Sequence, residues 1–207
     1  MPTPSSDDDL DRLATVTSTT LLDGLRDPAN RTIWNQYVDR YRPLVVRFCS
    51  RLGLESNDAE DVAQTSLVDF SQTYVAGGYE RERGRLRDWL YGIVRNRIRN
   101  HRRSESVREL PVDHEPEGPL GALAAREDLG EIWEEEWRDA ILRFCLREVQ
   151  REVDEPTYRA FELFALEERS ASEVAQELGL TPNAVYGAKR RIMERLKELR
   201  PRLEEAF

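Results

Sequence analysis

The chain has 207 residues, enough for one domain of ordinary size or two small ones, and a formal net charge of −9. No apolar run approaches the roughly 20 residues that span a bilayer, and the acidic start MPTPSSDDDLD is unlike a signal peptide, so we expect a cytoplasmic protein without a membrane partner. Cys49 and Cys145 lie far apart, without a CxxC motif or a nearby histidine cluster, which argues against a disulfide framework and against a zinc site.

The sequence of the N-terminal part of the chain predicts a short tail followed by helices. Residues 1–25 begin with Asp, Ser and Pro and are predicted to form a disordered acidic tail. From Ile33 to Leu52 apolar residues recur every three or four positions, as in an amphipathic helix, and Pro43 is predicted to kink or divide it. In NDAEDVAQTSLVDF a second helix begins, with Asn57 and Glu60 predicted to form a capping box.

A third helix is predicted from Leu86, after a glycine-containing loop at AGGYERERG. Its apolar residues recur at helical spacing and place arginines on the opposite face of the helix. We therefore predict a compact all-α domain over residues 26–103. Residues 104–130 contain Pro, Gly and many acidic residues without periodicity, which predicts a flexible acidic linker.

Residues 131–207 predict a second small helical domain. A helix with an apolar side runs from Ile132 to Val149, and another apolar helix follows Pro156. No strand-like alternation occurs, so the fold class is all-α, with two small domains joined by the linker.

The last two helices of this domain predict a helix-turn-helix. Ser170 and Glu173 form a capping box, Gly179 permits a sharp turn, and Thr181 can cap the helix that begins at Pro182. The residues of the last helix that lie mostly outside its core face, and that we predict to contact DNA, are Asn183, Tyr186, Lys189, Arg190 and Arg191. A helical hairpin with a solvated basic face is the non-functional alternative.

Charge is segregated along the chain. Residues 81–103 contain nine arginines against two acidic residues, a net charge of +7, and residues 185–202 contain seven Lys or Arg against two, a net charge of +5. Residues 105–137 contain eleven acidic residues against two arginines, a net charge of −9. The two basic segments are suited to nucleic acid despite the acidic total.

Three segments, in order, resemble bacterial sigma factors of the sigma-70 family, extracytoplasmic-function type. DAEDVAQTSLVDF resembles the acidic helix of sigma region 2, and RLRDWLYGIVRNRIRNHRR resembles the basic helix that follows it. RSASEVAQELGLTPNAVYGAKRRIMERLKEL resembles the helix-turn-helix of region 4. The resemblance covers roughly residues 30–103 and 135–200. It implies binding to core RNA polymerase and to promoter DNA, without a catalytic residue, cofactor or metal. A restraining anti-sigma factor is a candidate partner that the sequence does not identify.

The resemblance also implies roles for individual residues. Region 2 would bind the −10 element, partly as an unpaired strand, and region 4 the −35 element as a duplex. The predicted −10 contacts are Tyr91, Arg95, Asn96, Arg99, Arg102 and Arg103, with Tyr79 as a further stacking candidate; core packing is the better interpretation of Trp89. The predicted polymerase contacts lie on the acidic helix at Asp58, Asp61 and Gln64, and a solvated face with capping acids is the alternative.

Three other functions compete with this interpretation. A conventional helix-turn-helix regulator explains residues 170–200 but not the first basic helix. An enzyme has little support, because the chain has only two histidines and neither a phosphate-binding loop nor a nucleophile–base arrangement. A structural helical adaptor fits the composition but gives neither basic face a use.

Overall fold

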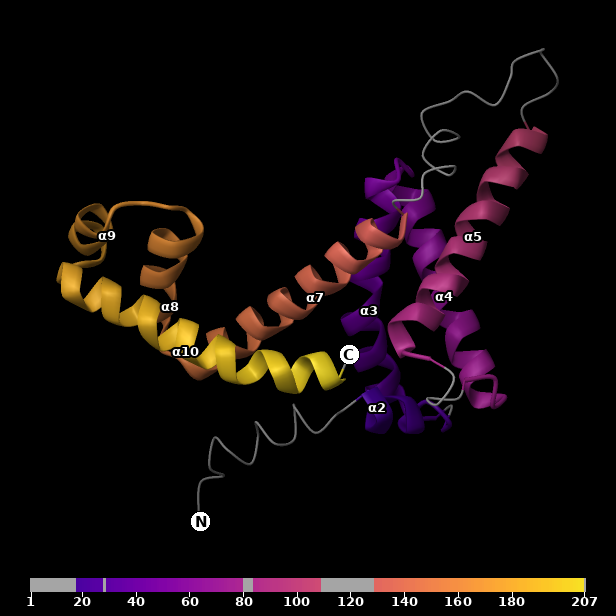
Figure 1. Cartoon of the computed structure of the whole chain (residues 1–207), viewed down its shortest axis with the longest axis horizontal. Coiled ribbons are helices and arrows are strands. Elements are labelled where there is room, and N and C mark those ends of the chain that lie inside the picture. Colours follow the sequence, from indigo (N-terminus) through magenta and orange to yellow (C-terminus); the bar gives the residue numbers. More distant parts are fainter. Residues whose placement is uncertain (1–17, 28, 80–83, 109–128, 207) are drawn as a thin grey trace. The chain divides into compact units, whose positions relative to one another are not determined.

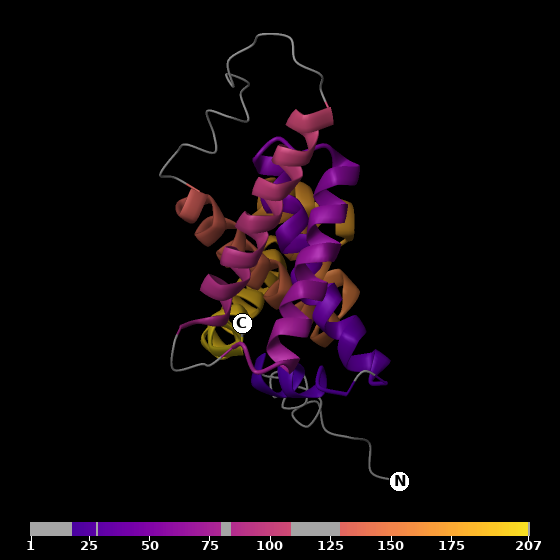
Figure 2. The same ribbon diagram turned by 90° about the vertical axis from the view of Figure 1, so that its right-hand side faces the viewer.

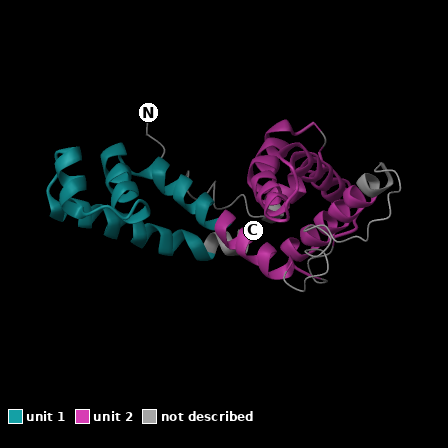
Figure 3. Cartoon of the chain, turned by 90° about the horizontal axis from the view of Figure 1, so that it is seen from above, with its two compact units in different colours: residues 1–17, 141–206 teal, residues 18–140, 207 magenta. Residues whose placement is uncertain are grey.

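The structure is a computed structural model, and it describes residues 18–27, 29–79, 84–108 and 129–206. Within these ranges every regular element is a helix (Figure 1), so the predicted all-α fold class is confirmed. The chain divides into an N-terminal unit, of which residues 18–140 are described with these gaps, and a C-terminal unit of residues 141–206 (Figure 3).

Three long helices form the body of the N-terminal unit: α3 (Arg31–Arg51), α4 (Ser56–Val75) and α5 (Leu86–Arg108). They lie alongside one another, with α4 in contact with both of the others (Figure 2). Tyr37 stacks on Phe70 with ring centroids 5.6 Å apart, and the Tyr37 hydroxyl donates to the carbonyl of Leu67 at 3.2 Å. The apolar residues that predicted these helices therefore form one aromatic-rich core.

The short helix α2 (Ser18–Gly24) corrects the predicted N-terminal tail. Leu21 and Leu22 are buried, and the Tyr74 hydroxyl donates to the Asp23 carboxylate at 2.8 Å. The prediction of disorder is therefore wrong for residues 18–25, because leucines in a polar stretch pack against helices formed by distant residues. Residues 1–17 lie outside the described range.

Helix α3 continues through Pro43, so Pro43 does not divide it, and the core residues Tyr41 and Leu44 are buried on both sides. The local prediction for the start of α4 is wrong. Helix α4 begins at Ser56, with Glu55 as its N-cap and without a side-chain cap. The predicted capping box of Asn57 and Glu60 is absent because the helix starts earlier, and Glu60 instead pairs with Arg42 at 2.8 Å.

The helix α7 (Leu129–Glu152) begins within the N-terminal unit, to which residues 129–140 belong. Trp133 and Trp137 are only 1% and 2% exposed, and the Trp133 ring lies 5.1 Å from that of Phe48. Buried Glu136 accepts from Arg47 at 3.3 Å and from Arg51 at 3.2 Å.

These contacts correct the domain boundaries. The predicted C-terminal domain of residues 131–207 loses its first ten residues to the N-terminal unit. The predicted linker of residues 104–130 is shortened at both ends, because α5 extends to Arg108 and α7 starts at Leu129. The rest of that linker lies outside the described residues.

The C-terminal unit contains α8 (Glu155–Phe161), the π-helical turn η2 (Glu162–Leu166), α9 (Ala171–Leu178) and α10 (Pro182–Ala206). Its buried core cluster consists of Ala160, Leu163, Ala171, Val174, Ala175, Val185 and Ala188. The apolar helix predicted after Pro156 is therefore not one regular α-helix, since its second half forms the wider π turn.

The turn between α9 and α10 has the predicted local chemistry. Ser170 and Glu173 form a capping box, and the hydrogen bonds from Ser170 lower the pKa of Glu173. Gly179 adopts a left-handed conformation with φ of 65°, which a residue with a Cβ adopts only at a cost. Thr181 Oγ1 accepts from the N–H of Ala184 at 3.2 Å, in the first turn of α10.

The buried Cys49 provides a first testable prediction. Burial raises the pKa of its thiol to about 12, so at pH 8 about one thiol in 10,000 is ionised, against about one in ten for an unperturbed cysteine. We expect iodoacetamide to modify Cys49 more than about 10-fold more slowly in the native protein than in urea, as measured by peptide mass spectrometry. Because burial disfavours the thiolate, the unfolded chain loses this proton at lower pH than the folded chain, and the free energy of unfolding falls as pH rises from 9 towards 12. Equal rates in both states would contradict the burial.

Candidate nucleic-acid interface

The exposed face of α5 is set by its buried face. Leu86, Leu90, Val94 and Ile98 are buried at four-residue intervals, which fixes the rotation of the helix about its axis. Among the predicted contact residues, Arg95, Asn96, Arg99 and Arg103 are exposed and Arg102 is half-buried. The structure thus leaves these side chains at least partly accessible along the outer side of α5, with Arg95, Arg99 and Arg102 at one cavity and Asn96 at another hollow.

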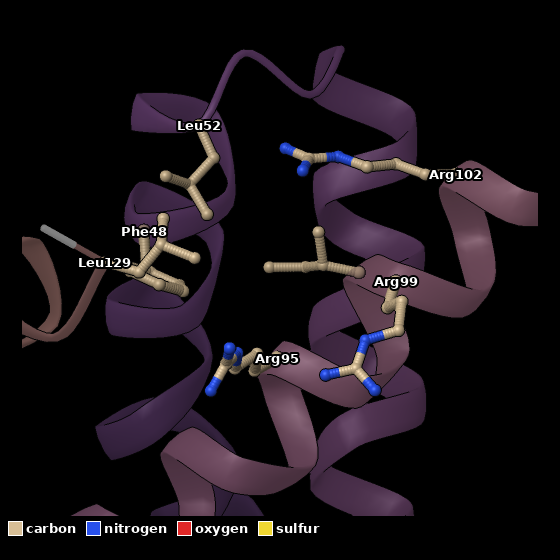
Figure 4. A pocket seen from close by; sticks show the side chains of 7 residues that line it. Phe48, Leu52, Arg95, Arg99, Arg102 and Leu129 are labelled. Atoms are coloured by element: carbon tan, nitrogen blue, oxygen red, sulfur yellow. The ribbon is translucent and has the colours of Figure 1, made fainter. Parts of the chain in front are cut away.

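Three of these arginines border a cavity of about 120 Å³ in the N-terminal unit. Arg95, Arg99 and Arg102 come from α5, together with the apolar Ile98 (Figure 4). The rest of the apolar lining consists of Phe48 of α3, Leu52 at the C-terminal cap of α3, and Leu129. In this view Arg102 extends from α5 towards Leu52. Guanidinium groups beside apolar side chains can hold both a phosphate and the flat face of a base.

The predicted stacking residues are already in contact with other aromatic rings. Tyr91 lies 5.6 Å from Trp133 and 6.1 Å from Phe48, measured between ring centroids, and is half-buried. Tyr79 stacks on Trp89 at 4.9 Å with an interplanar angle of 23°. A base that stacks on Tyr91 or Tyr79 must therefore share the ring with an aromatic neighbour.

Trp89 packs as the sequence predicted. Its ring lies 4.6 Å from that of buried Phe70, although the side chain remains half-buried rather than enclosed.

A second, polar hollow of about 320 Å³ lies between α4 and α5 and was not predicted. Amide side chains line it from both helices, Gln72 from α4 and Asn96 and Asn100 from α5, beside the ion pair of Arg97 with Asp69. The i, i+4 spacing of Asn96 and Asn100 was the available sequence signal, because it places both amides on one helix face. Gln72 could not be assigned without knowing how α4 packs.

The N-terminal half of α10 presents the other predicted surface. Asn183, Tyr186, Lys189, Arg190 and Arg191 are all exposed, while buried Val185 and Ala188 fix the opposite face. Arg191 also donates to the Thr157 hydroxyl at 3.3 Å. This face offers amide, hydroxyl, ammonium and guanidinium donors within three helical turns.

Known proteins resemble this chain in its sequence. A family model described as Sigma-70 region 2 matches residues 37–108, which run from α3 to the end of α5. The ECF RNA polymerase sigma factor SigD of Mycobacterium tuberculosis strain H37Rv is 30% identical over 175 residues, covering 82% of this chain and 77% of the relative. SigD of Mycobacterium bovis matches with the same identity and coverage. The chain belongs to the extracytoplasmic-function sigma factors of the sigma-70 family.

The segment that matches Sigma-70 region 2 includes helix α5. The chain is a sigma factor with a role in transcription initiation, and the matched segment contains the arginine cavity apart from Leu129 of α7. Membership of the family implies core RNA polymerase and promoter DNA as partners.

The acidic face of the sigma factor lies on α4. Asp61 and Gln64 are exposed, whereas the Asp58 carboxylate lies 3.1 Å from Nε2 of His101 on α5. Asp58 therefore connects two helices of the N-terminal unit, and Asp61 and Gln64 present the freer polar surface.

No helix in the described part of the sigma factor is long and apolar enough to cross a membrane. Nor do the described residues gather three or more His, Cys, Asp or Glu side chains that could hold a metal ion.

Proposed function

We propose that this sigma factor binds core RNA polymerase and recognises promoters through two surfaces, α5 for the −10 element and α10 for the −35 element. One observation supports this most strongly. Each compact unit exposes its own row of cationic and amide side chains on one helix face, fixed by a buried opposite face. A single-site DNA-binding protein has no use for the first of these surfaces.

The α5 surface suits an unpaired −10 strand. Arg95, Arg99 and Arg102 can neutralise backbone phosphates next to an apolar cavity, while Asn96 and Asn100 can pair with the exposed edge of a base. Each stacked base contributes about 1–3 kcal/mol to such binding. Stacking on Tyr91 would involve Trp133 as well, since the two rings are in contact.

The α10 surface suits the major groove of a −35 duplex. Side chains near the N-terminus of a recognition helix reach base edges, where Asn pairs with adenine and Arg or Lys with guanine. Asn183 and Lys189 are in this position, and Arg190 and Arg191 can meet phosphates on either side.

The acidic helix α4 is the proposed contact with core RNA polymerase. Asp61 and Gln64 are the exposed candidates for contact with the polymerase. Asp58 is the third candidate, and its carboxylate is held beside His101 of α5. The role needs no catalytic residue, cofactor or metal from the chain. It also places the protein in the cytoplasm, where an anti-sigma factor could bind the same surfaces.

Run-off transcription from a randomised promoter library tests this proposal. Core RNA polymerase with the wild-type chain should enrich promoters that share two conserved elements, whereas core polymerase alone should not. Promoters enriched in only one element, or none, would contradict the use of two surfaces.

A conventional operator-binding regulator remains the alternative, and its test uses the same selected DNA. The isolated chain should bind the selected duplex weakly, and core polymerase should be needed for tight binding. Tight sequence-specific binding by the chain alone would favour the regulator.

The substitution Lys189→Ala tests the upstream surface. It should weaken transcription about 5- to 20-fold on promoters that depend on the upstream element, because a cationic contact to DNA is lost. Lys197→Ala, an exposed lysine two turns further along α10, is the control and should leave transcription within about twofold. Equal effects of both substitutions would show that only overall charge matters.

A further inference from the structure

Phe164 lies in the π-helical turn η2 and contacts two of the proposed DNA-binding residues of α10. Its ring meets that of Tyr186 edge to face, with centroids 5.3 Å apart and an interplanar angle of 89°. The Nζ atom of Lys189 lies 5.1 Å from the centroid of the same ring. Half-buried Phe164 also packs against the core cluster of the C-terminal unit, so its position is fixed by that core.

The π turn is what places this ring. The N–H of Glu167 donates to the carbonyl of Glu162 at 2.9 Å, a five-residue spacing that widens the helix by one residue. Leu163 enters the buried cluster while the next residue, Phe164, stays at its edge. Single π turns of this kind are frequent at functional sites.

Tyr186 and Lys189 are exposed despite these contacts. Tyr186 is 55% exposed to solvent. Lys189 is exposed as well and lies three residues further along the same face of α10. An exposed lysine samples many rotamers, and binding through it requires that this freedom be lost. A ring that contacts the ammonium before DNA arrives reduces that loss.

We propose that Phe164 is a positioning residue for duplex recognition by α10, holding Tyr186 and Lys189 in the orientation in which they meet DNA. The proposal rests on the proposed function of α10 and adds a residue outside the recognition helix to it. Phe164 itself does not touch the duplex in this role. The ligand remains the acceptor-rich edge and phosphates of the upstream promoter element.

A mutant cycle in the full chain, assembled with core polymerase, tests this role. The probe is the upstream duplex selected by the wild-type holoenzyme, and binding is measured by competition. Phe164→Leu keeps an apolar contact with the core but removes the aromatic face, and should weaken binding about threefold to tenfold. In the Tyr186→Ala/Lys189→Ala background the same substitution should change binding by less than about twofold.

Three further variants distinguish positioning from folding. Phe164→Tyr keeps the aromatic ring and should restore wild-type binding. Leu166→Ala, an exposed residue of the same turn, should have no effect. Where Phe164→Leu lowers the thermal midpoint of the protein, Phe164→Met provides a second apolar replacement for the same cycle, since flexible Met fills such gaps.

The outcomes separate this inference from the function on which it rests. An equal loss from Phe164→Leu in both backgrounds would assign the residue to the fold alone and overturn the proposal. If Tyr186→Ala/Lys189→Ala itself leaves binding unchanged, the α10 surface is wrong and the positioning role is overturned with it. Loss of binding with strong coupling supports both.

Discussion

Trp133→Ala is expected to lower the free energy of unfolding of the N-terminal unit by about 3–5 kcal/mol, the cost of truncating a buried aromatic side chain. The ring is 1% exposed and contacts both Phe48 and Tyr91. Its Nε1–H donates to the carbonyl of Arg87 at 3.2 Å. Urea denaturation followed by circular dichroism measures the loss, and amide exchange in α3 and α5 locates it.

Two substitutions give the controls for this experiment. Trp133→Phe preserves most of the packing but loses the hydrogen bond to Arg87, and should cost about 1–2 kcal/mol. Leu142→Ala, on a half-exposed residue further along α7, should cost less than about 1 kcal/mol. If Trp133→Ala behaves like Leu142→Ala, residues 129–140 do not belong to the N-terminal unit.

The features that the sequence predicted well are those fixed by near neighbours in the chain. The capping box of Ser170 and Glu173, the left-handed Gly179 and the start of α10 at Pro182 each involve residues within four positions of one another. The cationic face of α5 followed from helical spacing in the same way, because buried Val94 and Ile98 leave Arg95 and Arg99 outside.

The features that the sequence did not predict depend on contacts between distant residues. Helix α2 is stabilised by the burial of Leu21 and Leu22, which polar neighbours in the sequence do not suggest. Residues 129–140 join the N-terminal unit through Trp133 and through Glu136, which pairs with arginines about 85–89 positions earlier. Acidic composition near a linker predicts solvation, and only the folded chain shows that Glu136 is buried.

The candidate site likewise contains residues that helical spacing identifies and residues that only contacts between helices identify. Helical spacing on α5 identifies Arg95, Asn96 and Arg99. The hollow lined by both Asn96 and Gln72 could not be predicted, because it forms only where α5 packs on α4. Helical spacing places Tyr91 on the outer face of α5, but its contact with Trp133 depends on the packing of α7, which spacing does not show. Phe164 was assigned only to an apolar helix, since a π turn has no recognised sequence pattern.

The double substitution Arg95→Ala/Arg99→Ala is expected to reduce promoter opening about 10- to 100-fold while leaving polymerase binding nearly unchanged. Both side chains are exposed and line the cavity where the unpaired strand is proposed to lie. Each charge-assisted hydrogen bond to a phosphate contributes about 1.5–3 kcal/mol, less where solvent screens it. Permanganate footprinting measures opening, and a fluorescence titration with labelled chain measures polymerase binding.

Salt dependence distinguishes loss of phosphate contacts from loss of structure. Removal of two contacts to a single strand should reduce the slope of log affinity against log salt concentration by about 1.4. The control Arg31→Ala/Arg138→Ala removes the same charge from exposed positions of the N-terminal unit that do not line the cavity, and should change neither opening nor slope. A similar defect in both double variants would mean that net charge, rather than the α5 surface, promotes opening. An unchanged slope with defective opening would instead assign Arg95 and Arg99 to the shape of the cavity, because contacts to phosphates cannot be lost without a change in counterion release.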